Sequence, residues 1–152
     1  AGAGCSLALA CDILIASENA AMSEIFVSIG LIIDAGSSYF LPRIVGSQRA
    51  FELCSTGRRL SAQECLDLGL VSKVVPANEF RATLELVAQQ YAKAPTKAIG
   101  LIKKVLNQSS HSSLEQMLEL EAIHQDEAAQ SHDFVEGVTA FLQKRPANFQ
   151  GK

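Results

Sequence analysis

The apolar residues in the first half of the chain form short runs rather than long stripes. Residues 12–16 (Asp-Ile-Leu-Ile-Ala) are rich in β-branched side chains and predict a buried strand, and 21–27 and 70–75 are further extended candidates. The small residues at 1–4 predict a tight turn, and the apolar stretch 6–10 is too short to predict a full helix. The first half is therefore expected to supply strands and short helices.

Glycines and serines mark the predicted boundaries of the short helices. The glycines at both ends of 30–36 supply the backbone freedom for a turn, and Ser37 or Ser38 is expected to cap the helix that follows. Two short helices are predicted over 39–44 and 47–55, separated by a glycine.

Two Ser-x-x-Glu patterns predict helix starts with a capping box. The first pairs Ser61 with Glu64, and its helix is expected to end at Gly69. The second pairs Ser112 with Glu115 at the start of a longer helix.

From residue 77 onward the apolar period becomes helical, which predicts four amphipathic helices. Little sheet is left to cover their apolar stripes, so part of this surface is expected to meet another subunit. The chain is accordingly divided into 1–76, mixed strands and helices, and 77–152, a helical region. The stripes consist of Phe80, Leu84, Val87 and Tyr91; Ile99, Ile102, Val105 and Leu106; Leu114, Met117, Leu118 and Ile123; and Phe134, Val138, Phe141 and Leu142.

The composition excludes several classes of protein. The chain has 152 residues, 48% of them hydrophobic and 19% charged, which is typical of a globular domain with a core of its own. No apolar run reaches the length of about 18 residues that predicts a membrane span. The net charge of −3 argues against a nucleic-acid-binding surface, which needs clustered lysines and arginines.

The cysteines and histidines do not form a metal-binding pattern. Cys5, Cys11, Cys54 and Cys65 match no CxxC spacing and sit among apolar neighbours. We expect four reduced, mostly buried thiols, as in proteins of the cytoplasm. The histidines lie in polar contexts, and no metal site is expected.

Two features carry candidate chemistry. Asp34 lies in an apolar stretch before a predicted helix, and a carboxylate in an apolar pocket is suited to act as a general base. The alternative is that Asp34 merely caps that helix. The glycine-rich opening 1–4 lies just before a short helix, and backbone N–H groups at that helix N-terminus could bind an anion or oxyanion; a tight turn without such a role is the alternative.

Several stretches, in order along the whole chain, resemble the crotonase superfamily, the enoyl-CoA hydratase/isomerase family. Within it, the pattern Gly-Leu-x-x-Asp-x-Gly-Ser is similar to that of the 1,2-epoxyphenylacetyl-CoA isomerase branch. The matching stretches are Ala-Gly-Ala-Gly-Cys-Ser-Leu-Ala-Leu-Ala-Cys-Asp-Ile-Leu-Ile-Ala (1–16), Gly-Leu-x-x-Asp-Ala-Gly-Ser-Ser (30–38), Leu-Pro-Arg-Ile-Val-Gly (41–46), Thr-Gly-Arg (56–58), Ser-Ala-Gln-Glu (61–64), Gly-Leu-Val-Ser-Lys-Val-Val (69–75) and Phe-Leu-Gln-Lys-Arg-Pro-Ala-Asn-Phe (141–149).

The resemblance implies an α/β fold of the crotonase type, a spiral of ββα units followed by a C-terminal helical trimerisation module. Residues 1–76 would form the later part of the α/β core and 77–152 the helical region, with the N-terminal part of the domain missing. A homotrimer or hexamer is expected, and this fragment alone is expected to have little or no activity.

The resemblance also implies a site for an acyl-CoA thioester. In the family two backbone N–H groups bind the thioester oxygen; one falls on Ala3 and the other lies upstream. Asp34 falls where isomerase members carry an acid/base aspartate, and Phe141 and Lys144 match positions that contact the CoA of a neighbouring subunit. No separate cofactor is expected, because coenzyme A is part of the substrate.

The family's hydratases use two glutamates, and both are replaced here. Their positions are occupied by Ser6 and Phe26. Glu24 is close in sequence, but two residues along an extended strand span about 6.6 Å, too far for a simple substitution. An acyl-CoA isomerase is therefore favoured, with an enoyl-CoA hydratase or a non-catalytic CoA-binding member of the family as alternatives.

Overall fold

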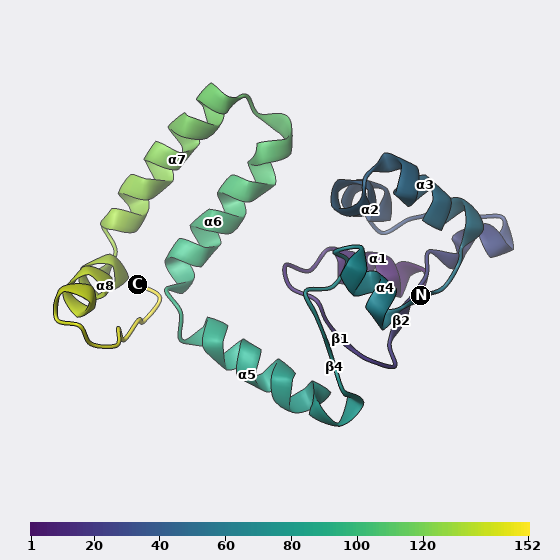
Figure 1. Ribbon diagram of the computed structural model, residues 1–152. Helices are drawn as coiled ribbons and strands as arrows, with labels where there is room; N and C mark the ends of the chain where they lie inside the picture. Colours follow the sequence, from purple (N-terminus) through teal and green to yellow (C-terminus); the bar gives the residue numbers. More distant parts are fainter. The chain divides into compact units, whose positions relative to one another are not determined.

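The computed structural model describes residues 1–152 and divides them into two compact units (Figure 1). We call Ala1–Leu84 the N-terminal unit and Glu85–Lys152 the C-terminal unit. The division falls within a helix, α5 (Phe80–Ala92), rather than after residue 76.

Short helices dominate the N-terminal unit, and its strands are only two or three residues long. β1 pairs in parallel with β4, and β2 pairs antiparallel with β3. The elements are α1 (Ala3–Leu9), β1 (Ile15–Ser17), β2 (Ala21–Met22), the 3₁₀ helix η1 (Ile25–Ile29), α2 (Ser37–Val45), α3 (Ser47–Thr56), β3 (Leu60–Ser61), α4 (Ala62–Asp67), β4 (Lys73–Val75) and the 3₁₀ helix η2 (Ala77–Glu79).

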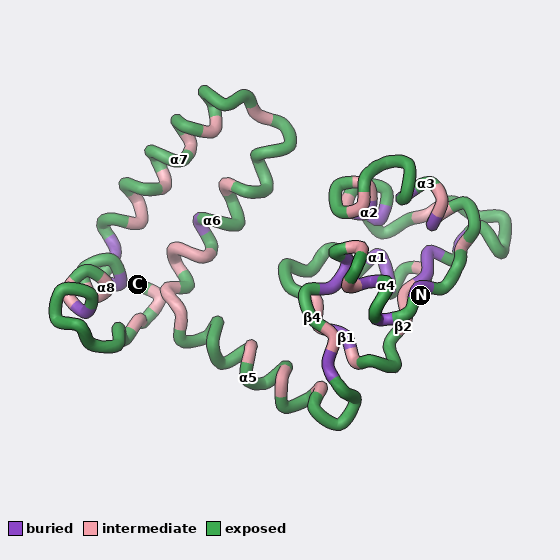
Figure 2. The backbone as a smooth tube through the Cα atoms, in the orientation of Figure 1, coloured by how far each residue is buried: buried purple, intermediate pink, exposed green.

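A single apolar core joins these elements. α1 packs against α2, and α2 against α3, so that helices far apart in sequence bury their apolar residues together. In Figure 2, most of the buried positions of the chain lie in this unit. The core consists of Cys5, Leu9, Ala16, Leu41, Ala50, Leu53, Leu60, Ala62, Cys65, Leu70 and Val71.

Three predictions for this unit are wrong. The strand predicted over 12–16 lies at Ile15–Ser17 instead, whereas the short helix expected after the glycine-rich opening is α1, whose Cys5 and Leu9, four residues apart, share one buried face. The extended segment 21–27 ends at Met22 and continues as η1. The strand predicted over 70–75 is confined to Lys73–Val75.

The C-terminal unit is helical, as predicted. α6 (Thr96–Gln108) packs against α7 (Leu114–Ala129), with the 3₁₀ helix η3 (Ser109–His111) between them, and α8 (His132–Leu142) follows. α7 is capped by Ser113 with Gln116 rather than by Ser112: both serines have an extended backbone, but only Ser113 makes the reciprocal bonds of a capping box.

Candidate active site

The glycine-rich opening forms the first turn of α1. Gly2 precedes the helix with φ of 54°, a left-handed value that favours glycine. Its N–H donates to the Ser23 carbonyl at 2.9 Å, and its own carbonyl accepts from the N–H groups of Cys5 and Ser6 at 2.8 and 3.1 Å. The Ala3 N–H lies in the first turn of α1, where amide groups have no intrahelical acceptor, and Ala3 is exposed.

Asp34 lies in the exposed loop between η1 and α2. Gly36 is the N-cap of α2 and no side chain caps this helix, so neither Asp34 nor a serine has the capping role that was considered. Asp34 contributes only its backbone carbonyl, which accepts from the Ser37 N–H at 3.0 Å. Its carboxylate is exposed rather than enclosed in an apolar pocket.

The backbone just after Asp34 is strained. Ala35 has φ of 49°, which is uncommon for a residue with a side chain, and Gly36 follows with φ of 88°. A Cβ at Gly36 would also lie 3.1 Å from the Phe40 ring. Strained backbone of this kind persists where the surrounding structure enforces it, often at functional sites.

A buried carboxylate that sequence reasoning dismissed lies beside α1. Glu24 is only 4% exposed, and its Oε2 accepts a hydrogen bond from the fully buried Ser6 hydroxyl at 3.4 Å. The sequence estimate assumed an extended strand at this point, but Glu24 stands at the N-terminal end of η1 with a bent backbone. The segment after Met22 therefore turns Glu24 toward Ser6, the position to which the resemblance assigns a hydratase glutamate.

The Glu24 carboxylate contributes to a raised pKa of two cysteine thiols, Cys5 and Cys54. Burial raises the pKa of the Cys5 thiol to about 12, and the charge and hydrogen bonding of Glu24 add to the effect. Burial and the Glu24 charge also raise the pKa of Cys54. Both thiols are therefore neutral near pH 7 and unsuited to nucleophilic catalysis. Cys65 is buried as expected, but Cys11 is exposed.

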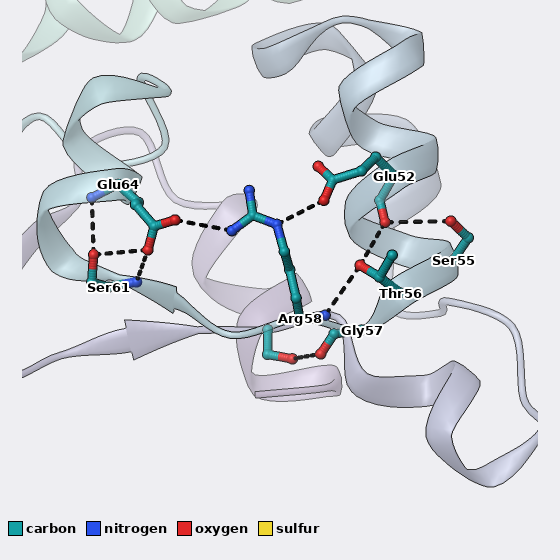
Figure 3. Close-up of polar contacts among 8 residues, drawn as sticks. Glu52, Ser55, Thr56, Gly57, Arg58, Ser61 and Glu64 are labelled. Carbon is teal, nitrogen blue, oxygen red and sulfur yellow. Dashed lines mark hydrogen bonds and ion pairs between the residues drawn. The ribbon is translucent and has the colours of Figure 1, made fainter.

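A polar cluster around Arg58 holds the turn at Gly57, which contacts the segment that contains Ser23 and Glu24 (Figure 3). The Arg58 guanidinium binds the carboxylates of Glu52 and Glu64 at 2.7 and 3.0 Å. Glu64 also completes the predicted capping box with Ser61, whose backbone N–H and hydroxyl, with Arg58, lower the pKa of the Glu64 carboxyl. The cluster fixes Gly57, whose carbonyl accepts from the Ser23 hydroxyl at 2.7 Å.

The contact at Gly57 is too close for a side chain. Gly57 has φ of 61°, and a Cβ there would lie 3.1 Å from Cγ1 of Val27 and 3.4 Å from Cα of Ile25. Ser23 thus makes two hydrogen bonds: its hydroxyl donates to the Gly57 carbonyl, and its own carbonyl accepts from the Gly2 N–H. These two bonds set the position of the next residue, Glu24.

Phe141 and Lys144 lie in the C-terminal unit, at the end of α8. Phe141 is 82% exposed, and Lys144 is exposed with φ of 52°. The neighbouring Arg145 is bound by both oxygens of Glu136, so Lys144 is the more available cation for a phosphate.

The structure brings together Ala3, Ser6 and Glu24, all within the first turns of α1 or in contact with it. Asp34 belongs to the same unit, on the loop that enters α2. No three His, Cys, Asp or Glu side chains are grouped closely enough to hold a metal ion. None of the helices combines the length and apolar character needed to cross a membrane.

Comparison with solved structures defines the class of fold. The chain superposes on the enoyl-CoA hydratase/isomerase of Cupriavidus metallidurans with a TM-score of 0.93 and 37% identity, covering 99% of this chain and 57% of that one. The fold is therefore of the crotonase type. The sequence profile described as Enoyl-CoA hydratase/isomerase matches residues 1–152. The chain belongs to the enoyl-CoA hydratase/isomerase family.

Curated relatives carry two different activities in their names. The chain is 41% identical to a "Probable enoyl-CoA hydratase" of Rhodobacter capsulatus and 40% identical to the 1,2-epoxyphenylacetyl-CoA isomerase of Escherichia coli. Both matches cover all of this chain but only 59% and 58% of the relatives. The chain thus spans less than two thirds of their length, and its correspondence to their later part stays a prediction.

Proposed function

We propose that the protein containing this chain is an acyl-CoA isomerase that moves a proton by way of an enolate of the thioester. Asp34 removes a proton from the α-carbon of a 3-enoyl thioester and returns it to the γ-carbon, so that the double bond moves one position toward the carbonyl. The carboxylate is regenerated, and one acid/base group is sufficient.

The observation that carries this proposal is the state of Asp34. Its carboxylate is exposed, caps no helix and stands beside the strained backbone of Ala35 and Gly36. The Asp34 side chain therefore caps no helix and makes no hydrogen bond, which leaves its carboxylate available to take up and return a proton.

The remaining parts of the proposal concern the substrate. The Ala3 N–H donates to the thioester oxygen and stabilises the enolate; this is supported by its place in the first turn of α1, where amide groups have no intrahelical acceptor. Exposed Phe141 and Lys144 bind the CoA of a neighbouring subunit, through ring contact and phosphate attraction, in a trimer or hexamer. Free cysteines fit a reducing compartment such as the cytoplasm.

The second candidate is an enoyl-CoA hydratase. It is favoured by the name of the Rhodobacter capsulatus relative and by Glu24, which places one carboxylate next to Ser6. Hydration requires groups that reach both the water and the α-carbon, whereas Glu24 is buried and Phe26 offers no carboxylate.

The two candidates differ in their substrates. The protein, expressed at its full natural length, is assayed with a 3-enoyl-CoA and with crotonyl-CoA, next to Asp34→Asn. Isomerisation of the first substrate, lowered by about 10² to 10⁴ in Asp34→Asn, is expected. Asp126→Asn, a charge-matched change on α7, serves as the control. Fast hydration of crotonyl-CoA that survives Asp34→Asn would establish the hydratase, and binding without turnover would indicate a non-catalytic CoA-binding protein.

A further inference from the structure

Two successive residues, Ser23 and Glu24, hold both ends of the first turn of α1. The Ser23 carbonyl accepts from the Gly2 N–H at 2.9 Å. The Ser6 hydroxyl lies 3.4 Å from Oε2 of Glu24 and 3.3 Å from the Gly2 carbonyl oxygen. The same short segment therefore hydrogen-bonds to α1 at Gly2, where the helix begins, and at Ser6, one helical turn later.

Glu24 is more deeply buried than its contacts justify. It is 4% exposed, its Oε1 has no hydrogen-bond partner, and it does not cap η1. The nearest cationic group lining the same small cavity is Arg58, which is already bound by Glu52 and Glu64. Burying a carboxylate in this way is costly, and an apolar pair would be more stable, so the position calls for an explanation in function.

The geometry of one peptide unit connects this pair to the proposed site. The Gly2 carbonyl and the Ala3 N–H belong to the same planar trans peptide and point in opposite directions. Gly2 is held at its nitrogen by Ser23, and at its carbonyl oxygen by the amides of Cys5 and Ser6 and the Ser6 hydroxyl. Whatever orients the Gly2 carbonyl therefore also aims the Ala3 N–H.

We propose that Ser6 and Glu24 are positioning residues that aim the Ala3 N–H at the thioester oxygen of the substrate. This inference rests on the proposed function, in which Ala3 supplies that donor. Glu24 acts through its acceptor oxygen, which keeps the Ser6 hydroxyl at the Gly2 end of α1; its charge is not required. Glutamine, which retains an acceptor oxygen, is then expected to replace it.

The test follows the thioester carbonyl directly. Hexanoyl-CoA labelled with ¹³C at the thioester carbonyl cannot isomerise, and its carbonyl stretching band moves to lower frequency when a donor polarises it. Binding and infrared difference spectra are measured on the full-length protein and on Ser6→Ala, Glu24→Ala, Glu24→Gln and the double alanine variant. Ser37→Ala is the matched control, because it removes another fully buried hydroxyl that has no partner.

We expect Ser6→Ala and Glu24→Ala to lose most of the carbonyl shift with little change in affinity. With a 3-enoyl-CoA they should lower kcat by about tenfold to a hundredfold while leaving KM nearly unchanged. The double variant should lose no more than either single variant, and Glu24→Gln and Ser37→Ala should keep the shift.

The outcomes separate this inference from the proposed function. A wild-type carbonyl shift that survives in Ser6→Ala and Glu24→Ala overturns the positioning role and leaves the isomerase proposal standing. A loss in Glu24→Gln equal to that in Glu24→Ala also overturns it, because the charge would then matter. If the wild-type protein binds hexanoyl-CoA without any carbonyl shift, or does not bind it, the proposed function itself fails. Should Glu24→Ala not fold, Ser6→Ala and Glu24→Gln still decide the matter.

Discussion

In the N-terminal unit, α2 and α3 bury Leu41, Ala50 and Leu53 in one shared core, whereas in the C-terminal unit α6 buries only Leu101 and α7 buries no residue. Leu101 and Ala140 are the buried apolar side chains of the C-terminal unit. Figure 2 shows the contrast along the tube, with buried positions concentrated in residues 1–84. Both regions have the same amphipathic period, so the period predicts a helix without predicting what covers it.

The difference suggests how each unit is stabilised. The N-terminal unit contains Ala3 and Asp34, the proposed oxyanion and acid/base groups, and is held by its own core and by hydrogen bonds such as that between Ser23 and Gly57. In the C-terminal unit, apolar residues including Ile102, Leu106 and Leu118 line an open groove between α6 and α7. The proposed trimer or hexamer would cover surface of this kind with other copies of the protein.

The largest expected effect is a core truncation in the N-terminal unit. Leu41 is 2% exposed and Leu106 is 63% exposed. Leu41→Ala should lower the free energy of unfolding by about 2 to 5 kcal/mol, because it loses buried apolar surface and leaves a cavity. Leu106→Ala, the matched change, should cost much less at low protein concentration. Urea unfolding at two protein concentrations checks both variants. Equal losses in the free energy of unfolding at low protein concentration would remove the contrast. A loss for Leu106→Ala that rises with protein concentration would show that a second copy covers α6.

Two glycines should respond to the same substitution with opposite signs. Gly57 has a positive φ and touches η1, so Gly57→Ala should destabilise the protein by about 1 to 3 kcal/mol. Gly100 lies inside α6 with nothing near its Cβ position, so Gly100→Ala should stabilise the helix by about 0.5 to 1 kcal/mol. Thermal unfolding gives both signs. Destabilisation by Gly100→Ala would mean that another chain packs closely on α6.

Local signals allowed a good part of the fold to be predicted. The apolar stripes gave α5 to α8, and the capping box of Ser61 and Glu64 gave α4, because these features depend on neighbours within a few residues. The prediction of an extended segment was wrong for residues 25–27, because their side chains favour a strand, while the close contact with Gly57 and the turn at Gly30 impose η1.

The candidate site was predictable only in part. Asp34 stands out by its motif, but its exposure and the strained Ala35 depend on how the loop is held. Glu24 was dismissed on the spacing of an extended strand, which the structure does not form there, and only the fold brings it to Ser6, its partner far away in sequence. A buried acidic residue next to a segment that resembles a catalytic motif is a signal worth testing in similar sequences.

A smaller effect should separate two adjacent serines at the start of α7. Ser113 accepts the N–H of Gln116 and is the N-cap, whereas Ser112, which the sequence pattern favoured, lies outside the capping box. Ser113→Ala should cost about 1 kcal/mol in the free energy of unfolding, and Ser112→Ala close to nothing. Chemical unfolding of both variants, with Ser61→Ala as the counterpart in the N-terminal unit, checks the assignment. A larger cost for Ser112→Ala would place the helix start one residue earlier.

The smallest expected effect concerns the end of the C-terminal unit, where Arg145 and Glu136 form an ion pair. Arg145, and after it the Asn148 N–H, lower the pKa of the Glu136 carboxyl from 4.5 to about 2. A carboxyl group with a lowered pKa in the folded state stabilises the fold above its ordinary pKa, and this contribution is lost as the pH falls from 4.5 to about 2. Because Arg145 is partly exposed, the contribution is small.

Glu136→Gln should therefore lower the unfolding temperature slightly at pH 7, and the difference from the wild type should shrink as the pH falls below 4.5 toward 2. Glu119→Gln, which removes an exposed carboxylate of α7 with no ion pair, provides the baseline. A difference that stays constant with pH would show that Glu136 acts by packing rather than by charge. The C-terminal unit would then be held by contacts of the same kind as the N-terminal unit, and the contrast between them would be one of degree.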